Sequence, residues 1–261
     1  MIWNSLHITS DPRGIVRVTL NRPDKRNVLS AEMIAELTEM ARTIGRDAKT
    51  RAIILAGAGS IFCAGGDLNW MKAQIAADRA QRMREARKLA EMLYALNTLP
   101  VPLIGRVQGG AFGGGVGMAC VCDVALAETG AKFCFSETRL GIIPATIAPY
   151  VSARMGEGNL RRVFMSARVF DATEAERLGI VSRVVANEDL DAAVEAEVVP
   201  YLQVAPGAVA AAKQLARDLG SRIDADIIDG TIRRLADTWE TPEAAHGVAA
   251  FLDKRHPNWT P

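Results

Sequence analysis

The sequence has no long hydrophobic run and almost no net charge. None of its apolar runs reaches the roughly 18 residues that a bilayer-spanning helix needs, so we expect no membrane segment. Its net charge of +1 gives no overall field toward nucleic acid or an acidic membrane surface. Both kinds of partner are therefore disfavoured. The composition, 49% apolar and 23% charged, is that of a globular protein, and 261 residues can form one large core.

Histidine is scarce, and cysteine is not arranged as a metal site requires. The 3 histidines are scattered, and the 4 cysteines lie in apolar or glycine-rich surroundings with no histidine nearby. We therefore expect no metal site and buried free thiols, as in a reducing cytoplasm. The N-terminal segment also lacks the basic and apolar regions of a signal peptide, so we expect a cytoplasmic protein.

Strand and helix patterns alternate up to about residue 185, and helices follow. This order predicts an α/β fold with a helical C-terminal region. The predicted strands are 16–20, 52–56, 102–107, 124–127 and 132–135. The predicted helices are one capped by Ser30, a long one at 78–97, and four more at 189–203, 206–219, 224–239 and 242–253.

A glycine-rich segment, 109–117, is followed by the small apolar run 118–123. The glycines let a ligand approach the backbone, and the apolar run suits a short buried helix. Such a helix directs unpaired N–H groups and its positive dipole end at the turn before it. The pattern predicts a site for an anion or an oxyanion.

Two phosphate-binding motifs can be compared with this segment. A Walker-type loop needs Lys after its last glycine, where this chain has Val116 after Gly115. The dinucleotide fingerprint needs a third glycine where Met118 stands. Both motifs fail, which favours a backbone oxyanion hole that polarises a carbonyl group. The second glycine loop, 62–68, also follows a buried strand, so one N–H group from each loop could converge on one oxygen.

Glu137 follows an aromatic, cysteine-containing strand and precedes a glycine turn. A carboxyl group in apolar surroundings has a raised pKa, which suits general acid–base catalysis. An ion pair with Arg139, or a cap for the following turn, is the alternative interpretation. Trp70 fits either the wall of an acyl pocket or the core. For Asp123 we expect a structural role in the turn to the next strand.

With these residues, the chain resembles the crotonase (enoyl-CoA hydratase/isomerase) superfamily over nearly its whole length. The resemblance rests on Asn21-Arg22-Pro23, the loop 62–68, the glycines of 110–115, and Phe135-Ser136-Glu137 with the segment 141–144. It implies a spiral of ββα units over residues 1–200 and a C-terminal helical trimerisation region over 201–261. It also implies a homotrimer or a dimer of trimers.

The resemblance further implies an acyl-CoA thioester as the substrate, with no separate cofactor because coenzyme A is part of that substrate. The N–H groups of Gly66 and Gly114 would hold the thioester oxygen, and Glu137 would be the catalytic acid or base. Phe251 and Lys254 would reach the coenzyme A of a neighbouring subunit. The other substrate-binding residues that it implies are Arg26, Val28, Ala64, Gly65, Asp67, Leu68, Trp70 and Gly117.

One departure from the superfamily bears on the reaction. Hydratases of the best-known type carry a second glutamate where this chain has Gly117, whereas one acid is the pattern of Δ3,Δ2-enoyl-CoA isomerases. The segments 67–71 and 140–150, however, look similar to bacterial methylglutaconyl-CoA hydratases of leucine degradation, which share the glycine. We therefore expect a hydratase of a short, branched or acidic enoyl-CoA.

Two alternatives stay open at this stage. One is an isomerase that uses Glu137 alone, and the other is a non-catalytic protein that binds acyl-CoA or RNA. The basic residues between Arg79 and Lys88 are expected to form a solvated helix face, although one of them could recognise a substrate carboxylate.

Overall fold

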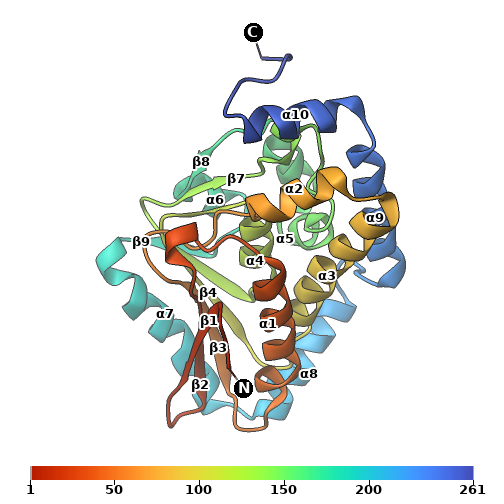
Figure 1. Ribbon diagram of the computed structural model, residues 1–261. Helices are drawn as coiled ribbons and strands as arrows, with labels where there is room; N and C mark the ends of the chain where they lie inside the picture. The colour runs from red at the N-terminus through yellow and green to blue at the C-terminus, as the bar shows by residue number, and fades with distance from the viewer. Residues whose placement is uncertain (1, 261) are drawn as a thin grey trace.

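The computed structural model describes residues 2–260, apart from the Leu68 side chain, and its centre is a six-stranded sheet (Figure 1). The strand order is β1-β2-β3-β4-β6-β9; β1 and β2 are antiparallel, and the other neighbours are parallel. The strands are β1 (Leu6–Ser10), β2 (Ile15–Leu20), β3 (Ala52–Gly57), β4 (Leu103–Val107), β6 (Val124–Glu128) and β9 (Arg183–Val185).

Helices cover both faces of this sheet, as its parallel strands require. On one face, Val18 and Leu55 belong to a core that includes Leu37 of α1 (Ala31–Arg42) and Leu93 of α3 (Arg79–Asn97). On the other face, Ile54, Ile104 and Leu126 pack with α7 (Leu190–Val198). Figure 1 shows α7 on one side of the sheet and α1 and α3 on the other.

A smaller sheet lies beside the first and carries the glycine-rich segment. It consists of β5 (Gly110–Phe112), β7 (Lys132–Cys134) and β8 (Phe170–Asp171). From β5 the chain passes directly into α4 (Gly114–Val121), and α5 (Ala148–Val163) packs on α4. Helix α6 (Ala172–Arg177) follows β8.

The C-terminal helices are α8 (Pro206–Asp218), α9 (Ala225–Trp239) and α10 (Pro242–Leu252). Helix α9 packs on α3, and α10 packs on α2 (Leu68–Ala76) and on the 3-10 helix η3 (Glu137–Leu140). Met71, Ile142, Trp239 and Val248 form a second core where these elements meet. Within this chain, α9 and α10 therefore cover the elements that carry the catalytic candidates.

The predicted α/β class and most of the predicted elements are confirmed, with the following differences. Strands β1, β5 and β8 and helix α2 were not predicted, and the helix predicted at 189–203 ends at Val198 before a 3-10 helix that contains Pro200. Helix α4 begins inside the glycine run at Gly114, not after it. All four cysteines are buried free thiols. Among residues 2–260, no helix is both long and apolar enough to cross a membrane.

Asn27 fixes the loop between β2 and α1. It is fully buried, and its side-chain amide donates to the carbonyl oxygens of Ala58 (2.8 Å) and Ile61 (2.9 Å). Its Oδ1 accepts from the Arg22 N–H at 3.0 Å. Its φ of 53° lies in the left-handed region, which Asn tolerates better than most residues. Asn27 thus joins the loop after β2 to the loop after β3.

Replacing Asn27 by Ala should lower the free energy of unfolding by about 3 kcal/mol, because two part-buried carbonyls and one N–H lose their partner. Urea denaturation followed by circular dichroism measures this loss. The exposed Asn187 is the matched control, and its replacement by Ala should change stability by less than about 0.5 kcal/mol. Equal effects of the two substitutions would contradict the role of Asn27.

Candidate active site

Two glycine loops lie against each other at one end of the central sheet. Isolated parallel bridges join Cys63 to Ala111 and Leu29 to Gly66. Gly65 has a φ of +94°, and a Cβ there would lie 2.9 Å from the Phe112 carbonyl oxygen. The loops are therefore so close that glycine is required at position 65.

This packing leaves two backbone amides without a partner. The bridge to Leu29 uses the Gly65 carbonyl and the Asp67 N–H. The Gly66 N–H takes no part in it. Within residues 2–260, neither the Gly66 N–H nor the Gly114 N–H has a hydrogen-bond acceptor. Gly66 and Gly114 both line one cavity of about 600 Å³. The arrangement offers two donors to an oxygen inside that cavity.

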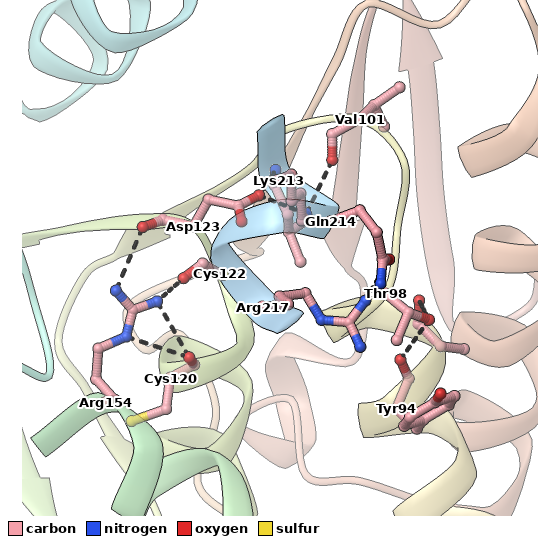
Figure 2. Close-up of polar contacts among 12 residues, drawn as sticks. Tyr94, Thr98, Val101, Cys120, Cys122, Asp123, Arg154, Lys213, Gln214 and Arg217 are labelled. Atoms are coloured by element: carbon pink, nitrogen blue, oxygen red, sulfur yellow. Dashed lines mark hydrogen bonds and ion pairs between the residues drawn. The ribbon is translucent and has the colours of Figure 1, made fainter. Parts of the chain in front are cut away.

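Helix α4 supplies one of these amides, and its opposite end is held by side chains. Arg154 donates to the carbonyl oxygens of Cys120, Cys122 and Asp123, which end the helix (Figure 2). A cation there satisfies terminal carbonyls and complements the helix dipole. The Asp123 carboxylate accepts from the Leu103 N–H at 2.7 Å and from Lys213 Nζ at 2.6 Å, the structural role that we expected.

Glu137 supplies the acid of the site from η3. A Cβ on Gly113 would lie 2.9 Å from Glu137 Oε1, so the carboxyl group packs against the first turn of α4. Glu137 Oε2 is buried and has no hydrogen-bond partner among the described residues. Burial raises the pKa of Glu137 to about 7, and hydrogen bonds from the backbone of Glu137 and Ser136 oppose that rise. Arg139 donates to the Ala167 carbonyl at 2.7 Å, and no ion pair joins it to Glu137.

Gly117 does not line the cavity, contrary to its prediction as a substrate-binding residue. A Cβ there would lie 2.4 Å from Ile147 Cγ2 and 2.9 Å from Ile147 Cβ. Gly113 and Gly117 share one face of α4, because residues four apart lie on the same side of a helix. Glu137 therefore covers the first turn of that face and Ile147 covers the next. Hydrocarbon fills the space that a second glutamate would need.

The cavity has a polar end and an apolar end. Arg22, Asp24, Lys25 and Arg26 line the polar end, with Val28, Ala64, Gly65 and Asp67 beside them. Asp67 is already engaged: it caps α2 through the Asn69 N–H (2.8 Å) and pairs with Arg22 (3.1 Å). The apolar end is lined by Trp70, Met71, Leu89, Leu140, Ile142, Ile143, Ile147, Leu235, Trp239 and Phe251.

A cavity with two free amides, one buried acid and an apolar end suits a thioester with an acyl chain. The family model described as enoyl-CoA hydratase/isomerase matches residues 10–261.

The chain belongs to the enoyl-CoA hydratase/isomerase family.

Three relatives show how far the similarity extends. A Mycobacterium leprae protein named "Probable enoyl-CoA hydratase echA8" is 33% identical over 249 residues, covering 93% of each chain. The mouse mitochondrial methylglutaconyl-CoA hydratase is 29% identical, covering 97% of this chain and 82% of the relative. The crystal structure of an enoyl-CoA hydratase from Shewanella pealeana matches with a TM-score of 0.81 and 37% identity, covering 98% of this chain and 96% of that one. The crotonase fold and superfamily expected from the motifs are confirmed.

Phe251 lines the cavity of its own chain, whereas Lys254 is exposed and does not line it. Their contact with the coenzyme A of a neighbouring subunit stays a prediction. The Leu68 side chain lies outside the described residues. In the basic stretch, Arg79 pairs with Asp237 at 2.6 Å and Arg87 pairs with Asp229 at 2.7 Å. None of the basic side chains between positions 79 and 88 lines the cavity.

Several residues that shape the site were missed at the level of sequence. Arg154 and Ile147 act on α4 from segments more than 20 residues away, and no local pattern marks such contacts. Arg22 lies in the segment Asn21-Arg22-Pro23 and Asn27 lies just after it. This segment indicated the family resemblance but no structural role for either side chain. A left-handed Asn after a proline turn is the signal that could have marked Asn27 as a clamp.

Folding stability should fall as the pH rises through the range in which Glu137 ionises in the unfolded chain but not in the folded one. The ordinary pKa is 4.5 and the folded value is about 7, so the folded state binds more protons between them. The loss should approach about 3 kcal/mol at neutral pH and above. Glu137→Gln should remove this dependence, and the variant should be more stable than the wild type at about pH 8 but not at about pH 4.5.

Urea denaturation at these two pH values tests this, with Glu157→Gln as the control because the Glu157 side chain is 82% exposed. A stability difference between the wild type and Glu137→Gln that is the same at both pH values would rule out a buried, protonated Glu137.

Gly117→Ala should lower the free energy of unfolding by about 1–3 kcal/mol, because the new methyl group overlaps Ile147. In an Ile147→Ala background, the same substitution should cost much less, since Cγ2 is gone. Gly158→Ala is the control, as a Cβ there meets nothing within 4 Å. Additive costs in the double variant would show that Ile147 does not occupy this space.

Proposed function

We propose that this protein is an enoyl-CoA hydratase, which adds water across the double bond of a 2-enoyl-CoA. One observation carries the proposal: Glu137, whose Oε2 is buried without a partner, lines the same cavity as Gly66 and Gly114, whose N–H groups have no acceptor among the described residues. The family relationship supports the same reaction class.

The two amides would bind the thioester carbonyl oxygen. When water adds to the β-carbon, negative charge moves onto that oxygen and an enolate forms. Each N–H donor then strengthens its hydrogen bond, and one such donor is typically worth about 2.7–4 kcal/mol in the transition state. The positive end of α4 adds to this stabilisation because Gly114 is its first residue.

A single carboxyl group can balance the protons of this reaction. Ionised Glu137 removes one proton from water as the oxygen bonds to the β-carbon. The protonated Glu137 then delivers that proton to the α-carbon of the enolate, and its carboxylate is restored. A pKa of about 7 suits both steps at neutral pH, because the group gains and releases a proton with little bias.

We propose that the polar end of the cavity binds the phosphate groups of coenzyme A. Lys25 and Arg26 are exposed there, and Arg26 is held at a φ of 52° by the loop that Asn27 clamps. Val28, Ala64, Gly65 and Asp67 would lie along the rest of the coenzyme A moiety. The acyl group would then extend past Gly66 and Gly114 toward Trp70 and Phe251.

For the acyl group we propose a short, branched chain, with 3-methylglutaconyl-CoA as the first candidate. The branched part suits the apolar wall formed by Met71, Ile142 and Ile147. For the carboxylate, the candidate partner is Arg139, a cavity-lining cation bonded to the Ala167 carbonyl. The similarity to the mouse methylglutaconyl-CoA hydratase is consistent with this substrate.

We also propose a homotrimer or a dimer of trimers, in which the C-terminal region takes part. Helix α8 contributes no buried residue to this chain, although Leu215 is 59% exposed and Leu219 is 81% exposed. Apolar side chains exposed on one helix favour association with another copy.

An isomerase that moves a double bond from position 3 to position 2 is the second candidate. The filled space over Gly117 favours it, because moving one proton needs only one acid and no water. The two functions differ in which thioester the protein consumes.

The wild type should hydrate 2-enoyl-CoA thioesters, and Glu137→Gln should lower kcat by about 10²-fold to 10⁴-fold without changing the Kd for acyl-CoA. The assay follows the loss of the conjugated double bond with crotonyl-CoA and with 3-methylglutaconyl-CoA. Glu157→Gln is the control and should behave as the wild type. Consumption of 3-enoyl-CoA alone would establish the isomerase, and binding without turnover of any of these thioesters would refute both enzymes.

A further inference from the structure

The Thr146 side chain is a buried polar group that the proposed function does not yet use. Thr146 is 7% exposed and lines the same cavity as Glu137. Its hydroxyl makes no hydrogen bond to any of the described residues, and Thr146 Oγ1 is not among their fully buried unpartnered atoms, so the hydroxyl is accessible from the cavity. A hydroxyl at a cavity wall without a protein partner is available to a molecule in the cavity.

The chain places Thr146 next to the space from which the second acid is missing. It directly precedes Ile147, whose side chain covers Gly117. The segment that carries both residues follows directly from η3, at whose end the Ile142 N–H donates to the Glu137 carbonyl at 3.3 Å. Gly117 N–H in turn donates to the Gly113 carbonyl at 3.3 Å, so the positions that Glu137 and Ile147 cover are one helical turn apart.

We propose that the Thr146 hydroxyl positions the reacting water together with Glu137, in place of a second carboxylate. This inference rests on the proposed hydratase function. One water hydrogen would be donated to Glu137 and the other to Thr146 Oγ1, which leaves an oxygen lone pair directed at the β-carbon.

Thr146 neither gains nor loses a proton in this arrangement. A threonine hydroxyl does not ionise near neutral pH, so the proton that leaves water goes to Glu137 and later to the α-carbon. Thr146 is a positioning residue, and the reaction still balances with one acid. The hydrocarbon of Ile147 beside it keeps other water from that side of the cavity.

Thr146→Val keeps the shape of the side chain and removes its hydroxyl, whereas Thr146→Ser keeps the hydroxyl. Thr146→Val should lower kcat for hydration by about 10-fold to 100-fold, because one oriented hydrogen bond to the water is lost. KM should change by less than about threefold. Thr146→Ser should restore most of the rate.

A second reaction separates water positioning from a general disturbance of the site. Exchange of the α-protons of a saturated acyl-CoA in D₂O needs the two amides and Glu137, but no water addition. Thr146→Val should leave this exchange rate unchanged. Thr173→Val is the matched control, since Thr173 is exposed and does not line the cavity, and it should retain the wild-type rate of hydration.

Three results would overturn the role of Thr146 while the hydratase function stands: an unchanged hydration rate in Thr146→Val, an equal loss of hydration and exchange, or an equal loss of hydration in Thr173→Val. A wild type that hydrates no 2-enoyl-CoA would instead refute the proposed function, and the role of Thr146 with it.

Discussion

The close approach of the two glycine loops is the constraint on which the rest of the site depends. A side chain at position 65 would meet the Phe112 carbonyl. The bridge between Leu29 and Gly66 uses the Gly65 carbonyl and the Asp67 N–H, so the Gly66 N–H takes no part in the contact between these segments. Gly66 is exposed and lines the cavity, and its N–H is therefore available to an oxygen ligand.

Helix α4 supplies the second amide of the site and is held in place at its other end. Its first residue provides the second amide, and the buried glycines Gly113 and Gly117 are covered by Glu137 and Ile147 in turn. Arg154 and the Asp123–Lys213 pair hold the other end of the helix. Because α4 has only eight residues, a shift at one end would be transmitted to the other. The side chains in Figure 2 therefore help to fix the position of the Gly114 amide.

The sequence was sufficient to predict the features that local patterns encode. Alternating apolar residues predicted β2, a continuous apolar run predicted β3, glycine spacing predicted two backbone donors, and the surroundings of Glu137 predicted a raised pKa. The sequence was insufficient to predict a contact between two residues that lie far apart along the chain. Nothing near Gly117 indicates that Ile147 fills its space, and nothing near Phe251 indicates that α10 returns to its own cavity. Such contacts depend on tertiary packing, and the periodic pattern of apolar residues along the sequence does not predict them.

The loss of one acid also changes what the remaining acid must do. With two carboxyl groups, one can take a proton from water while the other delivers one to carbon, and their pKa values can differ. In the proposed hydration, Glu137 alone would have to accept and then release the proton, so a pKa far from neutral would slow one of the two steps. Burial against Gly113 and an apolar wall places the pKa of Glu137 near 7, where neither step is strongly disfavoured. Replacing a second glutamate by Gly117 and Ile147 thus removes one charge and, by making the site more apolar, tunes the other.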